Sequence, residues 1–245
     1  MSERHIGVDE AGRGPAIGPL VVCALSIPKE DRIILKNMGV DDSKNLSKKR
    51  RKSIHSEIIT ISKSREWEIG IIRCSAGDID RWMESGNLNT LEVMLFAEAI
   101  SEVTNKTSEF TLFLDACDVD ARRFGRNVSF ALGERAGDFK IVSEHKMDAS
   151  DVITGAASII AKIHRDLAVD KLSKKWGVDL GSGYPSDTKS KNAIENLCRE
   201  EYLPDFLRRK WSNVERAWAM HHRKPIPQRE GGGPRSSQSA LDEWN

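Results

Sequence analysis

The stretch IGVDEAGRGPAIGPL, residues 6–20, carries the most specific pattern in this chain of 245 residues. An apolar run ends in two adjacent carboxylates, Asp9 and Glu10, and three glycines and two prolines follow at once. Buried charged groups are costly unless they are paired or bind a metal ion. The stretch therefore predicts a short buried strand that leads directly into a rigid, functional loop.

Four further segments have the apolar, β-branched composition of buried strands, namely residues 19–27, 67–76, 109–117 and 139–146. Apolar residues at helical spacing predict a helix over 89–105, with Asn89 or Thr90 as its N-cap, and one long helix over 151–176. Strands and helices in this order predict an α/β domain with a mixed β-sheet flanked by helices. A helical C-terminal part is expected from about residue 177.

The composition is that of an ordinary globular protein, with 39% hydrophobic residues and a formal net charge of +1. The chain has no apolar run of the ~18 residues that a membrane span needs, and its start lacks a signal-peptide pattern. A cytoplasmic protein is expected. The four cysteines form no Cys-x-x-Cys pair, so we expect buried free thiols rather than disulfides or a zinc site at Cys23, Cys74, Cys117 and Cys198.

The composition changes near the C-terminus. Residues 225–245 are rich in proline, glycine, serine and charged side chains, which is typical of a flexible tail. We therefore expect a folded domain over 1–224 and a tail over 225–245. Two isolated apolar residues, Leu241 and Trp244, lie near the end of that tail, where a simple linker would not need them.

Carboxylates follow several of the predicted strands. Asp9 and Glu10 end the first, Asp115 ends the strand over 109–117, and Asp148 follows the strand over 139–146. Ligands of open α/β sheets bind beyond the strand ends, so these groups are expected to converge. Crowded carboxylates repel one another unless a cation joins them, and hard oxygen ligands select Mg²⁺ or Mn²⁺. Two such ions, about 3.5–4 Å apart, can activate water against a phosphodiester. Taken singly, each carboxylate could instead cap a helix or fix a turn.

The glycines after the carboxylate pair suit a nucleic-acid substrate. Gly12 and Gly14 would allow the backbone to approach a sugar-phosphate closely, and Arg13 between them offers a charge to a phosphate. Basic clusters occur at residues 43–52, 122–126 and 208–210. Such clusters are usually solvated surface, and they point to phosphate only if they flank a site.

Several motifs, in order over residues 5–215, resemble the ribonuclease HII family (type 2 ribonuclease H), in its archaeal type. They are GVDEAGRGPAIGPLVV, DDSKNLSKKRR, FLDACDVD, EHKMDASDVITGAASIIAKIHRD, GSGYPSDTKS and FLRRKWSNV. The resemblance implies a ribonuclease H-like fold and a metal-dependent nuclease that acts in DNA replication and repair. It also implies that Asp9, Glu10, Asp115 and Asp148 are the catalytic, metal-binding carboxylates, with two ions during catalysis.

The resemblance also implies the substrate contacts. The loop of Gly12, Arg13 and Gly14 would recognise the ribose 2′-hydroxyl, which distinguishes RNA from DNA. Tyr184 would stack on the sugar at the RNA–DNA junction. Lys44, Lys162 and Ser158 match residues near the substrate backbone; alternatively, they are two surface lysines and a helix-packing serine.

The segment after the last acid departs from the archaeal pattern. Relatives usually have Asp-Ala-Lys-Tyr-Pro there, whereas this chain has Asp148-Ala-Ser-Asp151-Val. The additional Asp151 competes with Asp148 for the role of fourth metal ligand. We assign that role to Asp148 by alignment and expect Asp151 to cap the following helix, where an acidic group is favoured.

These features predict an endonuclease that cuts 5′ to ribonucleotides in RNA–DNA hybrids or in duplex DNA, leaving 3′-hydroxyl and 5′-phosphate ends. The alternatives are another metal-dependent nuclease on the same fold, such as a junction resolvase, and a non-catalytic nucleic-acid-binding module. A type 3 ribonuclease H would need an additional N-terminal domain, for which there is no room before residue 5.

The tail suggests a partner. Gln238, Leu241 and Trp244 have the spacing of the peptide that docks replication enzymes on a sliding clamp, although Asn245 replaces the usual second aromatic residue. A disordered segment that orders on binding would suit such docking. A chance match in a solubilising tail is the alternative. The enzyme itself is expected to be a monomer.

Overall fold

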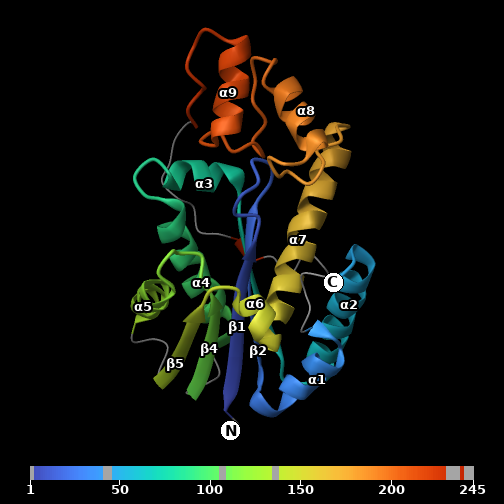
Figure 1. Cartoon of the computed structure of the whole chain (residues 1–245), viewed down its shortest axis with the longest axis vertical. Helices are drawn as coiled ribbons and strands as arrows, with labels where there is room; N and C mark the ends of the chain where they lie inside the picture. Colours follow the sequence, from blue (N-terminus) through green and yellow to red (C-terminus); the bar gives the residue numbers. More distant parts are fainter. Residues whose placement is uncertain (1–2, 41–45, 105–108, 134–137, 230–237, 240–245) are drawn as a thin grey trace.

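The computed structural model describes residues 3–40, 46–104, 109–133, 138–229 and 238–239, and these form a mixed sheet covered by helices on both faces (Figure 1). The strand order is β5-β4-β1-β2-β3-β6. The bounds are β1 Arg4–Ala11, β2 Leu20–Pro28, β3 Glu68–Cys74, β4 Glu109–Asp115, β5 Asp138–Glu144 and β6 Gln238–Ser239. The first five confirm the five predicted strands, and β1 continues through Glu10 to Ala11.

The central strand β1 sets the geometry of the sheet. It pairs antiparallel with β2 and parallel with β4, and Val8 lies beside Leu114 in that parallel register. Both side chains are fully buried. Because parallel strands end at the same edge of a sheet, the residues that follow Val8 and Leu114 meet there. Those residues are Asp9 and Asp115.

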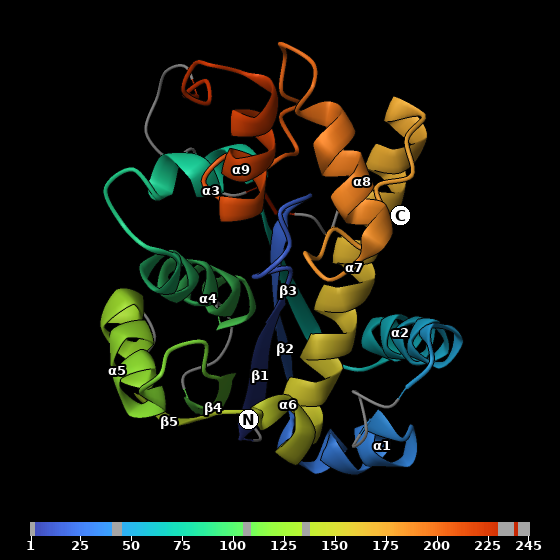
Figure 2. The same cartoon turned by 45° about the horizontal axis from the view of Figure 1, so that its top comes forward.

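Two apolar cores cover the sheet. On one face α4 (Leu88–Thr104) and α5 (Ala121–Leu132) pack against the strands, and on the other face lie α1 (Arg32–Asn37), α2 (Lys48–Ser64) and α7 (Val152–Trp176), as Figure 2 shows. The short helices η1, α3 and α6 span Lys29–Asp31, Ala76–Trp82 and Met147–Ser150. Because helices cover both faces of the sheet, every residue of β2 except the last is buried.

The predicted helix over 151–176 is α7, and its small-residue patch packs on β1. A Cβ atom added to Gly7 would lie 2.4 Å from the backbone of Ile153 and Thr154, so only glycine allows this approach. The predicted cap is confirmed, because the Asp151 carboxylate accepts hydrogen bonds from the N–H groups of Ile153 and Thr154 at 3.0 Å.

The predicted N-cap of the helix over 89–105 is wrong. This helix is α4, which begins at Leu88. The Asn87 side chain accepts a hydrogen bond from the N–H of Thr90 at 3.0 Å, and the Thr90 hydroxyl accepts one from the N–H of Asn87 at 3.2 Å. Three candidate capping residues occur within four positions, and only the backbone geometry distinguishes them.

A helical C-terminal part stands beyond one end of the sheet, with α8 (Thr188–Leu197) and α9 (Ser212–His221) at the top of Figure 1. Its own core includes Trp218, Leu207 and Ile17, the last from the glycine-rich loop. Ile17 and Leu207 also form an isolated antiparallel bridge. The loop after β1 therefore lies between the sheet and the helical part.

The chain remains packed beyond the predicted boundary at residue 224. Arg229 is nearly buried, and its Nε donates to Asp80 Oδ2 at 2.9 Å. Gln238 and Ser239 pair with Arg73 and Ile72 at the edge of β3. Whether residues 225–245 act as a flexible tail stays a prediction. Among the described residues, none of the helices is both long and apolar enough to cross a bilayer.

Candidate active site

Three of the four predicted carboxylates form a tight cluster. Asp9 from β1, Asp115 from β4 and Asp148 from α6 each place an oxygen within 4.8 Å of the other two. Asp9 and Asp148 are buried, whereas Asp115 is partly buried. The sheet register brings the first two together. The N–H of Met147 donates to Asp115 Oδ1 at 3.1 Å and so fixes the third beside them.

The cluster is electrostatically unfavourable without a cation. Burial, and then the negative charge of Glu10, raises the pKa of Asp9 well above its usual range. A cationic side chain lies close to Asp148, since Lys162 Nζ is 3.9 Å from its Oδ2. The clustered carboxylate oxygens, with the pKa of Asp9 raised by burial and by a neighbouring charge, fit a divalent metal ion of the Mg²⁺ or Mn²⁺ type.

Glu10 belongs to a neighbouring group rather than to the tight cluster. Successive side chains alternate between the two faces of a strand, but at this strand end the Asp9 and Glu10 carboxylates still interact. Glu10 gathers with Glu92 and Cys117, within 4.8 Å of both. Burial and the Glu10 charge raise the pKa of Cys117, so its thiol stays protonated and donates to Glu10 Oε2 at 3.2 Å. The Glu10 carboxylate is still close enough to raise the pKa of Asp9.

Asp151 lies outside this cluster. Besides capping α7, its carboxylate forms an ion pair with Arg32 at 2.5 Å. Both carboxylate oxygens of Asp151 are thus engaged by structural partners, Oδ2 by Arg32 and Oδ1 by Ile153 and Thr154. This placement supports Asp148, rather than Asp151, as the carboxylate at the candidate metal centre.

The glycine-rich loop is held by its carbonyl oxygens. Arg208 is fully buried, and its guanidinium donates to the carbonyls of Gly12, Arg13 and Gly18 at 2.6, 3.0 and 3.1 Å. The Trp211 indole donates to the Gly14 carbonyl at 3.0 Å. Gly12 has φ +97°, a conformation that other residues rarely adopt. The carbonyl side of the loop is therefore committed to the helical C-terminal part.

The Arg13 side chain is directed to α4. It forms an ion pair with Glu92, a fully buried carboxylate, and donates to Asn89 Oδ1 at 2.7 Å. Neither Glu92 nor Asn89 was predicted from the sequence to be part of the site. Both residues lie within α4, and the apolar spacing of that helix gave no reason to assign its polar residues to a site.

Three of the predicted substrate contacts lie around the same site. Ser158 is buried on α7 and accepts a hydrogen bond from Lys162 Nζ at 2.8 Å. Tyr184 is 41% exposed, and its ring would be 3.9 Å from a Cβ atom on Gly14. The Arg165 guanidinium lies 5.1 Å from the centre of that ring. The partly exposed Tyr184 ring therefore lies directly beside the glycine-rich loop.

The structure does not place the remaining predicted residues at the site. Lys44, Leu241 and Trp244 lie outside the described residues. Gln238 is placed only by its backbone, in β6 at the edge of the sheet. Nothing in the geometry of the site tests their predicted roles.

Comparison with known proteins identifies close similarities. The model of the family Ribonuclease HII matches residues 6–214. Ribonuclease HII of Pyrococcus furiosus is 42% identical over 211 residues, covering 86% of this chain and 89% of that protein. The crystal structure of ribonuclease H2 from Pyrococcus horikoshii OT3 aligns with a TM-score of 0.78 at 32% identity, covering 90% of this chain and 100% of that one.

Two further structures are relevant. RNase HII in the PCNA:RNase HII complex from Archaeoglobus fulgidus has a TM-score of 0.73 at 31% identity, over 85% of this chain and 95% of that one. Bst-RNase HIII in complex with Mn²⁺ has a TM-score of 0.74 at 21% identity, over 91% of this chain and 71% of that one, which shows a shared fold.

Proposed function

This chain belongs to the ribonuclease HII family and is a metal-dependent endoribonuclease, and from this premise we propose that it cuts 5′ to ribonucleotides in RNA–DNA hybrids and in duplex DNA. The products would be 3′-hydroxyl and 5′-phosphate ends. One juxtaposition supports this proposal above all: the buried carboxylate cluster lies at the end of the same strand, β1, that leads into the glycine-rich loop, with the Tyr184 ring beside it.

The carboxylates are the proposed metal ligands. Asp9, Asp115 and Asp148 would hold Mg²⁺ or Mn²⁺, and Glu10 would contribute from the neighbouring group. Two ions bound there would activate the attacking water and stabilise the leaving oxygen. The donor set of carboxylate oxygens suits either metal, and the manganese complex of the distant structural relative makes Mn²⁺ a reasonable choice for assays.

The glycine-rich loop is the proposed ribose reader. Arg208 and Trp211 donate to the loop carbonyls on one side. Within the described part of the chain, the backbone N–H groups of Gly12, Arg13 and Gly14 donate to no backbone carbonyl outside the strands, so we propose that they bind a substrate hydroxyl. A 2′-hydroxyl that hydrogen-bonds to this loop would place its neighbouring phosphate at the carboxylates. Tyr184, beside Gly14, would stack on the adjoining sugar.

Lysines at the site would hold the scissile phosphate. Lys162 lies between Asp148 and Ser158, where its charge offsets the carboxylates and can reach a bound phosphate oxygen. Ser158 keeps the Lys162 ammonium in this position. Lys44 is proposed to contact the backbone as well, on the family resemblance alone.

We propose a sliding clamp as the partner of the C-terminal tail, through Gln238, Leu241 and Trp244. The proposal is supported by the motif spacing and by the PCNA complex of the Archaeoglobus fulgidus relative. A clamp would raise the local concentration of the enzyme on DNA without changing its chemistry. The monomeric state and the cytoplasmic location stay predictions.

Cleavage of a labelled DNA duplex with one embedded ribonucleotide tests the proposed function, with an all-DNA duplex as control. We expect one cut, 5′ to the ribonucleotide, in Mg²⁺ or Mn²⁺, and none with chelator. Asp115→Asn removes a charge from the cluster but keeps its shape, so cleavage should fall by at least about 10²-fold. Equal cutting of both duplexes would indicate a general nuclease. Binding without any cutting would indicate a non-catalytic module.

A further inference from the structure

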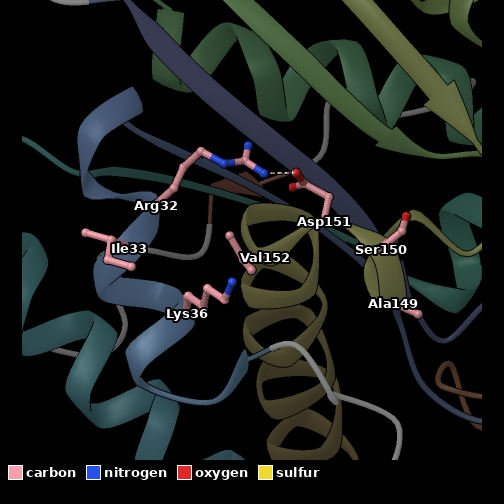
Figure 3. A pocket seen from close by; sticks show the side chains of 7 residues that line it. All are labelled: Arg32, Ile33, Lys36, Ala149, Ser150, Asp151 and Val152. Carbon is pink, nitrogen blue, oxygen red and sulfur yellow. Dashed lines mark hydrogen bonds and ion pairs between the residues drawn. The ribbon is translucent and has the colours of Figure 1, made fainter.

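A pocket of about 440 Å³ lies between α1 and the start of α7 (Figure 3). Its wall on one side is Arg32, Ile33 and Lys36 from α1, and on the other the segment 149–152. That segment begins immediately after Asp148. Ala149 and Ser150 are the last two residues of α6, the four-residue helix that carries Asp148, so one wall of the pocket is built on the same helix as a carboxylate of the candidate metal centre.

The pocket has an excess positive charge. Arg32 and Asp151 neutralise each other in their ion pair, and the Asp151 carboxylate is further occupied by the α7 N-terminus. Lys36 is a second cation, and Figure 3 shows its ammonium directed toward Val152. No carboxylate among the described residues lies within ion-pair distance of Lys36. One cation of the pocket is therefore left for an anionic ligand.

The wall that Arg32 forms is fixed in place. Besides pairing with Asp151, Arg32 lies 3.1 Å from His5 Nδ1 and 5.0 Å from the centre of the Phe113 ring. By contrast, Lys36 is exposed on the outer turn of α1 and is able to move toward a ligand. Ile33 and Val152 add apolar surface, which suits the edge of a sugar more than a free ion.

We propose that this pocket binds a backbone phosphate of the substrate strand, close to the cut but distinct from the scissile phosphate, with Lys36 as its charged contact. The inference rests on the proposed function, because it needs a strand held at the carboxylate cluster. Lys36 acts on the position and affinity of the strand rather than on the bond that breaks. Its loss therefore affects KM and leaves kcat unchanged.

The test uses Lys36→Gln on the embedded-ribonucleotide duplex, with Lys36→Arg as the charge-conserving variant. A contact of this exposure is worth up to about fivefold in KM, with kcat retained. Lys36→Arg should keep the wild-type KM. The dependence of log affinity on log salt should fall in slope by about one in Lys36→Gln, as expected for one lost phosphate contact.

A matched control is Lys175→Gln. Lys175 is exposed near the far end of α7, about 35 Å along the helix from the pocket at 1.5 Å per residue. It should keep the wild-type KM. An equal rise in KM for Lys175→Gln would show only general attraction of DNA to a positive surface, and would overturn the proposal.

Substrates with a single neutral methylphosphonate, moved one position at a time, identify the phosphate. In the wild type one position other than the cut should raise KM about as much as Lys36→Gln does. In Lys36→Gln, neutralising that position should have no further effect. If the variant stays as sensitive as the wild type at every position, the proposal is wrong.

Inorganic phosphate separates a strand contact from a free-anion site. We expect millimolar phosphate to inhibit wild type and Lys36→Gln alike, because one charge-assisted contact does not retain a free ion. Inhibition that disappears in Lys36→Gln would assign the pocket to free phosphate instead. If no variant cuts the ribonucleotide duplex, the proposed function has failed, which is distinguishable from unchanged kinetics in Lys36→Gln.

Discussion

At the scale of single residues, the site depends on side chains that never need to touch substrate. Arg208 is the clearest example, because its buried guanidinium donates hydrogen bonds to three carbonyls of the glycine-rich loop. Its burial, beside Arg165, lowers its pKa, and the three acceptors hold the charged form in place. Buried Glu92 likewise holds the Arg13 side chain of the loop through an ion pair. The conformation of the loop is thus determined from two directions.

Arg208→Lys should keep the positive charge but lose hydrogen bonds that hold the glycine-rich loop in its conformation. A lysine ammonium cannot reproduce the planar fork that reaches three carbonyls, so at least one buried carbonyl loses its donor, at a cost of about 1–3 kcal/mol in the free energy of unfolding. Cleavage at a ribonucleotide should fall about tenfold or more in kcat/KM. Thermal unfolding and cleavage rates measure the two effects. Arg199→Lys, at an exposed arginine just after α8, is the control; equal losses in both variants would contradict this role for Arg208.

At the scale of elements, α7 links the site to the rest of the molecule. Its first residue lies in the Lys36 pocket, its first turns pack on Gly7 of β1, and it carries Ser158 and Lys162. Further along, His164 is 3% exposed and contacts His55 of α2, with the two Nε2 atoms 3.4 Å apart. Burial, and then the charge of His55, lowers the pKa of His164 to about 4.

This histidine makes the α2–α7 contact sensitive to acid. The unfolded chain takes up a proton near pH 6.5, but folded His164 resists protonation until about pH 4. The free energy of unfolding should therefore fall as the pH is lowered from about 6.5 to about 4, by about 3 kcal/mol from this residue. Urea unfolding across that range should show a smaller fall for His164→Gln. His221→Gln, at an exposed histidine of α9, should match the wild type; a wild-type slope in His164→Gln would contradict the assignment.

At the scale of the whole molecule, the sheet and the helical C-terminal part share the glycine-rich loop and a second connection through Arg229. The Arg229 side chain contacts Asp80 of α3 and, through a bond of 2.7 Å, the carbonyl of Leu207. Asp80 is buried and also accepts from the N–H groups of Arg209 and Lys210 at 2.9 and 3.2 Å. The two parts are thus fixed relative to one another on either side of the site.

Shortening the chain from its C-terminus tests where the folded domain ends and the tail begins. A chain ending after residue 229 loses the two-residue strand β6 but keeps the Arg229–Asp80 ion pair, so its stability should stay close to that of the wild type. One ending after residue 224 leaves buried Asp80 without this ion-pair partner. We expect the shorter chain to lose about 3 kcal/mol in the free energy of unfolding. Denaturant titration measures the difference, and Arg229→Gln in the full chain should reproduce it. Equal stability of the two truncated chains would place the boundary of the domain at 224, as the composition predicts.

The sequence by itself determined the order and type of the principal elements and the positions of the candidate carboxylates along them. Apolar, β-branched runs and helical spacing are local patterns, so they predicted five strands, α4 and α7, and they put Asp9 and Asp115 at strand ends. The acidic cap at Asp151 was predictable for the same reason, since a cap involves only neighbouring residues. The N-cap of α4 was not, because Asn87, Asn89 and Thr90 are chemically similar there.

Only the tertiary structure decided which distant residues meet. The parallel register of β1 and β4 brings Asp9 and Asp115 together, while Glu10 gathers with Cys117 and Glu92. Arg208 lies almost two hundred residues from the loop that it holds, and Lys36 shares a pocket with residues after Asp148. Such contacts depend on the packing of whole elements, and no periodicity or motif spacing encodes the distance between two elements that are far apart in the chain.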